Sequence, residues 1–144
     1  MGRITELLGK RSPVVHLVSP GQTVLEAVAL MAARRVGALP VVENGRLVGI
    51  FSERDLVRRV VAAGRPLDKT LLAEVMTPDP VTAAPGDESA LAVLKMEEVQ
   101  CRHLPVVQHG AVVDMLSIRD LLFDELEDRA QAEASLRRYI GGSY

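Results

Sequence analysis

The apolar and polar positions of this chain follow the same order twice. Each copy opens with a short apolar stretch that predicts a turn of helix, then a short strand, and then apolar residues at the spacing of an amphipathic helix. Two apolar strands joined by a tight turn follow, and a second helix begins directly after them. The predicted elements of the first copy are a helical turn at 4–8, a strand at 14–18, a helix from 23, strands at 39–42 and 47–51, and a helix from 52. Those of the second copy are a helical turn at 71–76, a strand at 81–83, a helix from 87, strands at 104–107 and 112–116, and a longer helix that begins at 117–118 and runs to 140.

Local signals mark several of these boundaries. Pro-Gly pairs at 20–21 and 85–86 predict turns before the first long helix of each copy. Thr23-x-x-Glu26 has the spacing of a capping box, in which a hydroxyl and a carboxylate satisfy free N–H groups reciprocally. Asn44-Gly45 indicates a tight hairpin turn, and His109-Gly110 fills the same place in the second copy. Gly141-Gly142 predicts the end of the last helix.

The duplication is visible residue by residue. Residues 20–57 align without a gap on residues 85–122, and 15 of the 38 positions are identical. A long period with only two copies indicates a duplicated half-domain rather than a repeat array. Two such copies usually pack about a pseudo-two-fold axis, which places equivalent residues around shared clefts. The predicted fold is α/β (α+β), with tandem β-α-β-β-α repeats at 7–63 and 71–128, a linker at 64–70 and a C-terminal helix extension at 129–144.

Composition narrows the functional classes. Of the 144 residues, 48% are apolar, which is enough for a core, and the net charge is -2. The absence of a long basic run argues against a dedicated nucleic-acid binder. The apolar stretches are far shorter than the ~18 residues of a membrane span, and the first residues lack the apolar segment of a signal peptide. The single cysteine, Cys101, excludes an intramolecular disulfide. We therefore expect a soluble cytoplasmic protein without a nucleic-acid or membrane partner.

Several motifs in the duplicated segments are family-specific when taken together. They are Met76-Thr77-Pro78-x-Pro80-Val81-Thr82, the Leu-Pro-Val-Val strands at 39–42 and 104–107, Gly49-Ile50-Phe51-Ser52-x-x-Asp55 and Leu116-Ser117-x-x-Asp120. In this order, and duplicated, they resemble the CBS domain, named from cystathionine β-synthase. The resemblance covers about residues 7–127 and suggests a stand-alone tandem CBS pair.

What the resemblance implies is a regulatory module rather than an enzyme. CBS pairs commonly bind adenosine derivatives, such as AMP, ADP, ATP, NAD or S-adenosylmethionine, in clefts between the two copies. In that family the Ser/Thr-x-x-Asp motif holds ribose and phosphate, and residues beside the strands cradle adenine. Carried over, the expected nucleotide-binding residues are Ser52, Arg54, Asp55, Ser117, Arg119, Asp120, His16, Ala38, Pro40, Val81, His103 and Pro105. The nucleotide would be a regulatory ligand, and the resemblance implies no required cofactor.

The residues themselves leave an alternative open at each motif. Ser-x-x-Asp is also a simple capping box, although a capped helix start remains an anion site. Arg54 and Arg119 would lie in the first turn of their helices, where a cation opposes the helix dipole by roughly 0.3–1 kcal/mol. An anionic ligand would compensate this in both copies, but so would a salt bridge to a neighbouring acid. Inheritance from one ancestral copy would explain the repetition equally well.

The two copies differ at positions that predict unequal sites. Gly49 permits close backbone approach in the first copy, whereas Asp114 stands at the equivalent position of the second. Arg58 lies one turn beyond Arg54, whereas Asp124 lies one turn beyond Asp120. We therefore expect the Asp55 site to accept more phosphate groups than the Asp120 site.

The last predicted helix carries an apolar stripe of Leu122, Leu126, Ala130, Leu136 and Ile140. A helix that projects past its own domain needs a partner to cover such a stripe. The stripe favours a homodimer contact, although packing back on the same chain is the alternative.

These observations favour a nucleotide sensor that acts on an unidentified protein target. A ligand-independent dimerisation or docking scaffold is the alternative. An enzyme is disfavoured, because the sequence contains no nucleophile–base pair, metal cluster or Gly-rich phosphate loop.

Overall fold

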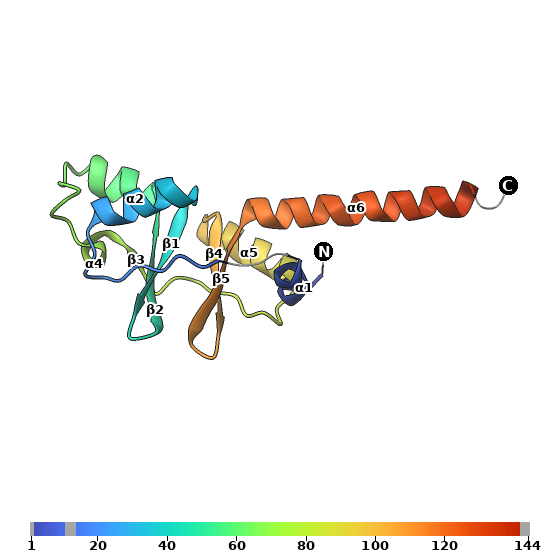
Figure 1. Ribbon diagram of the computed structural model, residues 1–144, viewed down its shortest axis with the longest axis horizontal. Helices are drawn as coiled ribbons and strands as arrows, with labels where there is room; N and C mark the ends of the chain where they lie inside the picture. The colour runs from blue at the N-terminus through green and yellow to red at the C-terminus, as the bar shows by residue number, and fades with distance from the viewer. Residues whose placement is uncertain (1, 11–13, 142–144) are drawn as a thin grey trace.

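A computed structural model describes residues 2–10 and 14–141 (Figure 1). The first repeat contributes α2 (Val24–Arg34), β1 (Ala38–Glu43), β2 (Arg46–Ser52), α3 (Glu53–Asp55) and the π-helical η1 (Leu56–Val61). The second contributes α5 (Ser89–Val99), β4 (His103–Gln108), β5 (Ala111–Ser117) and α6 (Ile118–Gly141). Three further short elements are α1 (Ile4–Gly9), α4 (Leu72–Val75) and β3 (Thr77–Pro78). The mixed α+β fold and the long C-terminal helix predicted from the sequence are confirmed.

The two hairpins have the same register. Ala38 pairs with Ser52 and Glu43 with Arg46 in β1–β2, and His103 pairs with Ser117 and Gln108 with Ala111 in β4–β5. In both hairpins the register shifts at the same place in the first strand, between Val41 and Val42 and between Val106 and Val107. The two hairpins lie side by side, and β2 and β5 are in contact (Figure 1). A duplicated sequence has therefore produced a duplicated hairpin that packs against itself.

Both hairpin turns have the backbone that the sequence predicted. Asn44 and Gly45 have φ angles of 51° and 78°, and His109 and Gly110 have φ angles of 52° and 79°. Positive φ at both central residues is the geometry of a type I′ turn, which matches the twist of the flanking strands. Asn and His are both enriched at positive φ, which suits each turn.

The strands predicted at 14–18 and 81–83 are shorter than expected. Each is reduced to a single parallel bridge, Val18 with Val41 and Ala83 with Val106. The pairing cannot extend because the next ladder bonds would need the N–H groups of residues 40 and 20 in the first repeat and of residues 105 and 85 in the second, and all four are prolines. The N–H of Ser19 donates to Gln22 Oε1 at 2.9 Å, and the N–H of Ala84 donates to Asp87 Oδ2 at 2.9 Å.

The starts of the two long helices also differ from the expectation in detail. The hydroxyl of Thr23 accepts the N–H of Glu26 at 3.2 Å, which is one half of the predicted box. The Glu26 carboxylate instead accepts from Gln22 Nε2 at 3.1 Å. The second helix begins at Ser89 and not at Asp87, since Asp87 stabilises the preceding turn.

Strand β3 was not predicted. Thr77 and Pro78 pair with Ile50 and Gly49 of β2, which extends the first sheet to three strands. A Cβ atom at Gly49 would lie 2.5 Å from Met76 Sδ and 3.0 Å from the Thr77 carbonyl oxygen. Glycine is therefore required here because the chain itself approaches, not because space is left for a ligand.

The two short helices pack across the boundary between the repeats. Ile4 and Leu7 of α1 belong to the core of the second repeat, beside Leu104 and Leu116. Leu72 of α4 belongs to the core of the first repeat, together with Val75. Backbone hydrogen bonds hold each helix there: the N–H of Ile4 donates to the Asp87 carbonyl at 2.9 Å, and the N–H of Leu72 to the Gln22 carbonyl at 2.9 Å. Each hydrophobic core thus contains a helix from outside its own strand–helix segment.

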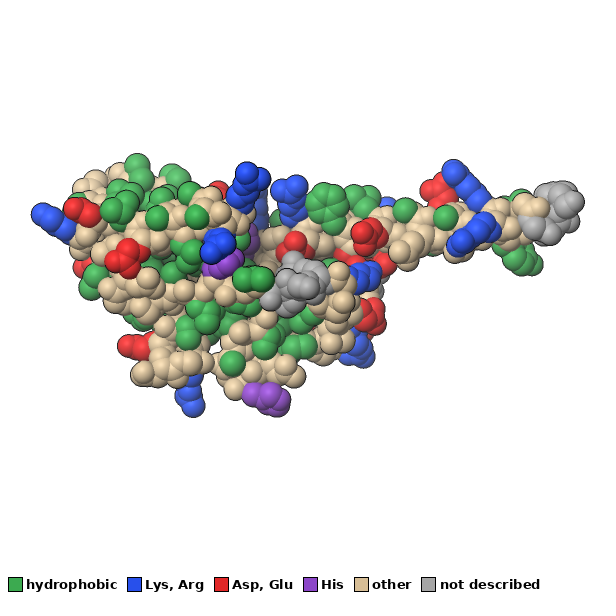
Figure 2. Space-filling model, viewed as in Figure 1, with side chains coloured by type: hydrophobic (Ala, Val, Ile, Leu, Met, Phe, Trp, Pro, Cys, Tyr) green, Lys and Arg blue, Asp and Glu red, His purple; other side chains and the backbone are tan. Residues whose placement is uncertain are grey.

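The final helix is the largest difference between the repeats. The first repeat ends with the short helices α3 and η1, whereas α6 is a regular helix of 24 residues. Its far half projects from the body of the protein (Figures 1 and 2). Gly142, predicted to help stop this helix, lies outside the described residues. Within the described part of the chain, no helix is both long and apolar enough to cross a membrane.

Candidate functional site

Two of the clefts between the repeats each contain one Ser-x-x-Asp helix start. The cleft at Ser117 and Asp120, here called the Asp120 cleft, has a volume of about 680 Å³. The cleft at Ser52 and Asp55, the Asp55 cleft, has a volume of about 440 Å³. Four residues line both clefts: Gly37, Glu53, Arg102 and His103. The two clefts are thus neighbours that share a wall.

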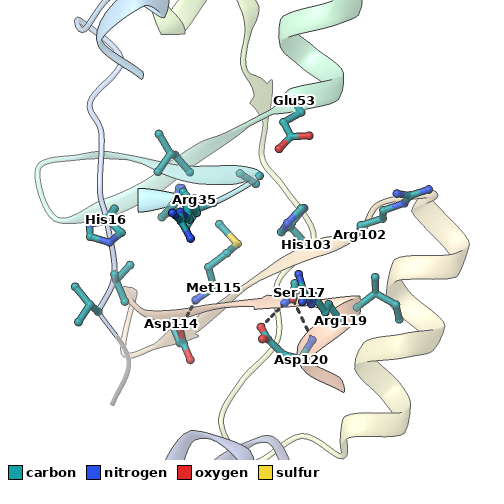
Figure 3. Close-up of a pocket in the computed structure, with 18 residues that line it drawn as sticks. His16, Arg35, Glu53, Arg102, His103, Asp114, Met115, Ser117, Arg119 and Asp120 are labelled. Carbon is teal, nitrogen blue, oxygen red and sulfur yellow. Dashed lines mark hydrogen bonds between the residues drawn. The ribbon is translucent and has the colours of Figure 1, made fainter. Parts of the chain in front are cut away.

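The Asp120 cleft collects residues from both repeats (Figure 3). Arg119 and Asp120 come from the start of α6, and Met115 comes from β5. The opposite side comes from the first repeat. It consists of His16 before the bridge at Val18, the turn 35–37, and Ala38 and Pro40 of β1. Of the predicted residues, the structure brings Ser117, Arg119, Asp120, His16, Ala38, Pro40 and His103 together here.

The Asp55 cleft is the equivalent cleft on the other side of the shared wall. It is lined by Ser52, Arg54 and Asp55 of the first repeat, and by Val81 and His103 of the second. All five are predicted residues. Pro105 is the exception among the predicted residues: it is buried in β4 and lines neither cleft. Its carbonyl accepts the N–H of Ala83 at 2.9 Å, so it supports the second parallel bridge instead.

Both Ser-x-x-Asp motifs form capping contacts. Asp55 Oδ2 accepts the N–H of Ser52 at 3.0 Å, and the Ser52 hydroxyl accepts the N–H of Asp55 at 3.3 Å. Asp120 Oδ2 accepts the N–H of Ser117 at 3.0 Å, and the Ser117 hydroxyl accepts the N–H of Asp120 at 3.1 Å. The capping interpretation of the motif therefore holds. It does not exclude ligand binding, because a capped helix start is still an anion site.

Asp55 has structural partners beyond its cap. Its Oδ1 atom accepts the hydroxyl of Thr77 at 3.0 Å and lies 3.6 Å from Arg59 Nε. The side chain is only 7% exposed. The carboxylate of Asp55 thus ties the start of α3 to β3 and to η1, and its removal would disturb the first repeat as well as the cleft.

The two predicted arginines lie at equivalent positions but in different surroundings. Both are the second residue of their helix, as the sequence predicted. The guanidinium of Arg119 lies 5.5 Å from the centre of the Phe123 ring, which partly satisfies its charge. Within residues 2–10 and 14–141, no hydrogen bond or ion pair joins Arg54 to another side chain. Arg54 is therefore a cation in the wall of the Asp55 cleft that is available to an anion.

His103 occupies the wall shared by the two clefts. Burial lowers the pKa of His103 below its ordinary value and Arg102 acts in the same direction, while the carboxylates of Glu53 and Asp120 oppose the change. The imidazole is therefore neutral at neutral pH and can both donate and accept a hydrogen bond. A Cβ atom at Gly37 would lie 3.1 Å from both Glu53 Oε1 and His103 Cε1, so glycine leaves room for both side chains at the shared wall.

Sequence reasoning missed several wall residues. They are Arg35, Gly37, Glu53, Asp79 and Arg102. Three of them stand in the turns that precede the Leu-Pro-Val-Val strands, and Glu53 is the variable position of the first Ser-x-x-Asp motif. Their closeness to the recognised motifs was the available signal. No signal in the sequence indicated that these turns face the helix start of the other repeat.

Two of the reasons given for a phosphate preference of the Asp55 cleft, those that rest on Gly49 and Arg58, do not hold in the structure. The space beside Gly49 is filled by Met76 and Thr77. Arg58 is exposed and does not line the cleft. Asp114 does line the Asp120 cleft, where it is 5% exposed and accepts the N–H of Met115 at 2.7 Å.

Cys101 is half-buried in the wall of the Asp55 cleft. Burial raises the pKa of its thiol, so the sulfur stays protonated and weakly nucleophilic.

Comparison with known proteins decides the family. The model of the CBS domain matches residues 7–62 and again residues 72–126. This chain belongs to the CBS-domain family. The family resemblance predicted from the sequence is thus confirmed, including its occurrence in two copies.

Relatives of this CBS-domain chain include both small and large proteins. It is 36% identical over 120 residues to the CBS domain-containing protein YhcV of Bacillus subtilis, covering 83% of this chain and 85% of YhcV. It is 35% identical over 129 residues to CBSCBSPB3 of Arabidopsis thaliana, but this match spans only 23% of that protein. The chain thus corresponds to nearly all of one relative and to about a quarter of another.

Solved structures with the same fold include one with a bound nucleotide. The CBS domain protein PAE2072 of Pyrobaculum aerophilum, complexed with AMP, matches with a TM-score of 0.73 and 33% identity, covering 82% of this chain and 88% of that protein. A candidate signal-transduction protein with CBS domains from Burkholderia ambifaria matches with a TM-score of 0.83 and 30% identity, covering 88% and 95%. The chain is therefore similar to CBS-domain proteins of the signal-transduction type.

Proposed function

We propose that this protein is a regulatory module that binds an adenosine-containing nucleotide in the clefts between its two CBS repeats. One observation carries the proposal. Each cleft combines a capped helix N-terminus and an arginine from one repeat with apolar residues from the other. The helix N-terminus and arginine suit a phosphate, and the apolar wall suits the face of a base. The AMP complex of the Pyrobaculum protein supports the same ligand class.

The Asp120 cleft is our proposed principal site. It is the larger cleft, at about 680 Å³ against about 440 Å³. Three arginines line it, Arg35, Arg102 and Arg119, whereas Arg54 and Arg102 line the Asp55 cleft. The similar Pyrobaculum protein was solved in complex with AMP. AMP is therefore the ligand that we expect to bind best.

A matched pair of blocking variants tests this proposal. His16 and Val81 are equivalent in the two repeats, and each lies in the wall of only one cleft. His16→Trp should fill the Asp120 cleft and Val81→Trp the Asp55 cleft, without touching either capping motif. Isothermal titration with AMP, ATP, NAD and S-adenosylmethionine should show AMP binding that is lost mainly in His16→Trp.

Each other result has a definite meaning. Loss of AMP binding mainly in Val81→Trp would reverse the assignment of the principal site. Equal loss in both variants would indicate two equivalent sites. No binding of any of these ligands to the unmodified protein would refute the nucleotide proposal.

In the last case the second candidate function, a dimerisation or docking scaffold, would be favoured. The exposed apolar residues of α6 support it independently. The two functions are compatible. A homodimer whose halves shift on nucleotide binding would pass the signal to a protein target, provided that the nucleotide binds one arrangement more tightly than the other.

A further inference from the structure

The projecting part of α6 leaves a regular stripe of its surface uncovered. Leu122, Leu126, Leu136 and Ile140 are 55%, 60%, 59% and 49% exposed. The body of the protein covers a different face of this helix, which buries Leu121 and Asp124. At 3.6 residues per turn, the stripe continues between Leu126 and Leu136 through Arg129 and Glu133. The uncovered seam therefore reads Leu122, Leu126, Arg129, Glu133, Leu136, Ile140.

The order of residues in this seam is symmetric about Gln131. Arg129 and Glu133 stand two residues on either side of it, Leu126 and Leu136 five, and Leu122 and Ile140 nine. The spacings of four and three residues along the seam are those of the a and d positions of a heptad. A seam that is symmetric in this way fits a second copy of itself running in the opposite direction.

We infer that α6 pairs with α6 of a second copy of this chain as a short antiparallel coiled coil centred at Gln131. Leu126 then packs against Leu136 of the second copy, and Leu122 packs against Ile140. The two central layers each bring Arg129 of one copy to Glu133 of the other. A parallel pair would instead place Arg129 against Arg129 and Glu133 against Glu133, which repel each other. The charges of the seam thus select both the partner and the direction.

Both central charges already have partners within the isolated helix. Arg129 Nε lies 3.2 Å from Glu125 Oε1, and Arg137 Nη2 pairs with Glu133 Oε1 at 2.6 Å. These ions are exposed, so they keep their hydration until the copies meet. Pairing across the dimer adds a second partner of opposite charge to each ion. The central layers therefore set direction, while the apolar layers on both sides supply most of the association energy.

Charge reversal tests the pairing directly. Arg129→Glu and Glu133→Arg should each weaken self-association roughly tenfold or more, because two attractive contacts become repulsive. The double variant should restore the original affinity, although it leaves the contacts within each helix repulsive. An equimolar mixture of the two single variants should form a heterodimer. Sedimentation equilibrium at several protein concentrations measures all of these.

Arg138→Glu is the matched control, because Arg138 lies on the opposite face of the helix and is exposed. It should leave self-association unchanged. A monomeric unmodified protein, equal weakening by Arg138→Glu, or a double variant that is not restored would each overturn the inference. None of these measurements involves a nucleotide, so their outcome is separate from that of the proposed cleft function.

A crosslinking experiment tests the direction of the pair. In a Cys101→Ser background, Ala130→Cys flanks the seam close to the proposed centre. A short bismaleimide should then join two copies through this position, because antiparallel helices bring the two residues about 3 Å apart along the axis. Ala134→Cys is the matched control on the outer face and should not crosslink. Equal crosslinking at both positions, or crosslinking at Ala134→Cys alone, would contradict the antiparallel arrangement.

Discussion

The two clefts begin with the same motif and end with different walls. Ser52 with Asp55, and Ser117 with Asp120, make nearly the same capping contacts. Around them the walls differ: Asp114 lines the Asp120 cleft, whereas Gly49, at the equivalent position of the first repeat, packs against Met76 and lines neither cleft. Repetition of a motif therefore reproduces its local geometry, which depends on a few neighbouring residues. It does not reproduce the site, which depends on residues from the other repeat.

The cross-packed short helices make this comparison stronger. Because α1 completes the second core and α4 the first, each half is supported by a short helix from outside its own strand–helix unit. A change in one of these helices should therefore be felt first in the core that it enters. Four predictions use this comparison, from the largest expected effect to the smallest.

Leu72→Ala should lower the free energy of unfolding by about 2–5 kcal/mol, the range for a fully buried leucine. Ile4→Ala, also fully buried, is its counterpart in the other core. Urea unfolding measures both losses. Hydrogen exchange should show that Leu72→Ala loosens β1 and β2 first, and that Ile4→Ala loosens β4 and β5. The opposite assignment would contradict the packing described above.

Gly49→Ala should lower the free energy of unfolding by about 1–3 kcal/mol, the range for overpacking. The added Cβ meets Met76 Sδ at 2.5 Å and must displace β3 from the edge of β2. Gly21→Ala is the control, since no atom lies within 4 Å of a Cβ added there. Thermal unfolding at one pH compares the two variants. Equal destabilisation by both would contradict the steric requirement for glycine at position 49.

Ser52→Ala should lower the free energy of unfolding by roughly 0.5–2 kcal/mol, because the N–H of Asp55 loses its capping acceptor. Ser117→Ala is the matched variant in the second repeat, where the cap has nearly the same length. We expect similar losses in urea unfolding, since capping is the part of the motif that is truly duplicated. Losses that differ by more than threefold would show that the local geometry is not equivalent.

Stability should fall modestly as the pH drops through the ordinary pKa of histidine, because of His103. Its pKa is lowered in the folded state, so the unfolded chain binds the proton more readily over this range. The loss begins near pH 6.5 and levels off once the folded protein is also protonated. His103→Gln should flatten this part of the profile of melting temperature against pH, while His109→Gln, at an exposed hairpin turn, should not. An unchanged profile in His103→Gln would assign the pH dependence to other groups.

Much of the fold could be predicted because its signals are local. The Asn44-Gly45 turn, the apolar strands and the capping serines each depend on residues within a few positions of one another. The failures have one cause in common. Strand β3, the shortened bridges at Val18 and Ala83, and the neighbours of Gly49 all depend on contacts between segments far apart in the chain.

The candidate site divides in the same way. Eleven of the twelve predicted residues line a cleft, because the motifs that carry them belong to the elements that flank it. Pro105 lines neither cleft, because prolines at equivalent positions of the two repeats are not equally exposed to a cleft. Arg35 and Arg102 were missed because the turns that hold them become part of a cleft wall only when the other repeat packs against them.

By itself, the sequence determined the duplication, the family, the order of elements and the capped helix starts, since each is written in short-range patterns of residue type. Only the tertiary structure decided which core each short helix enters, which cleft is larger, and which arginines face it. These features depend on how one repeat packs against the other. The residues that meet in this packing are far apart in the chain and follow no regular spacing in the sequence.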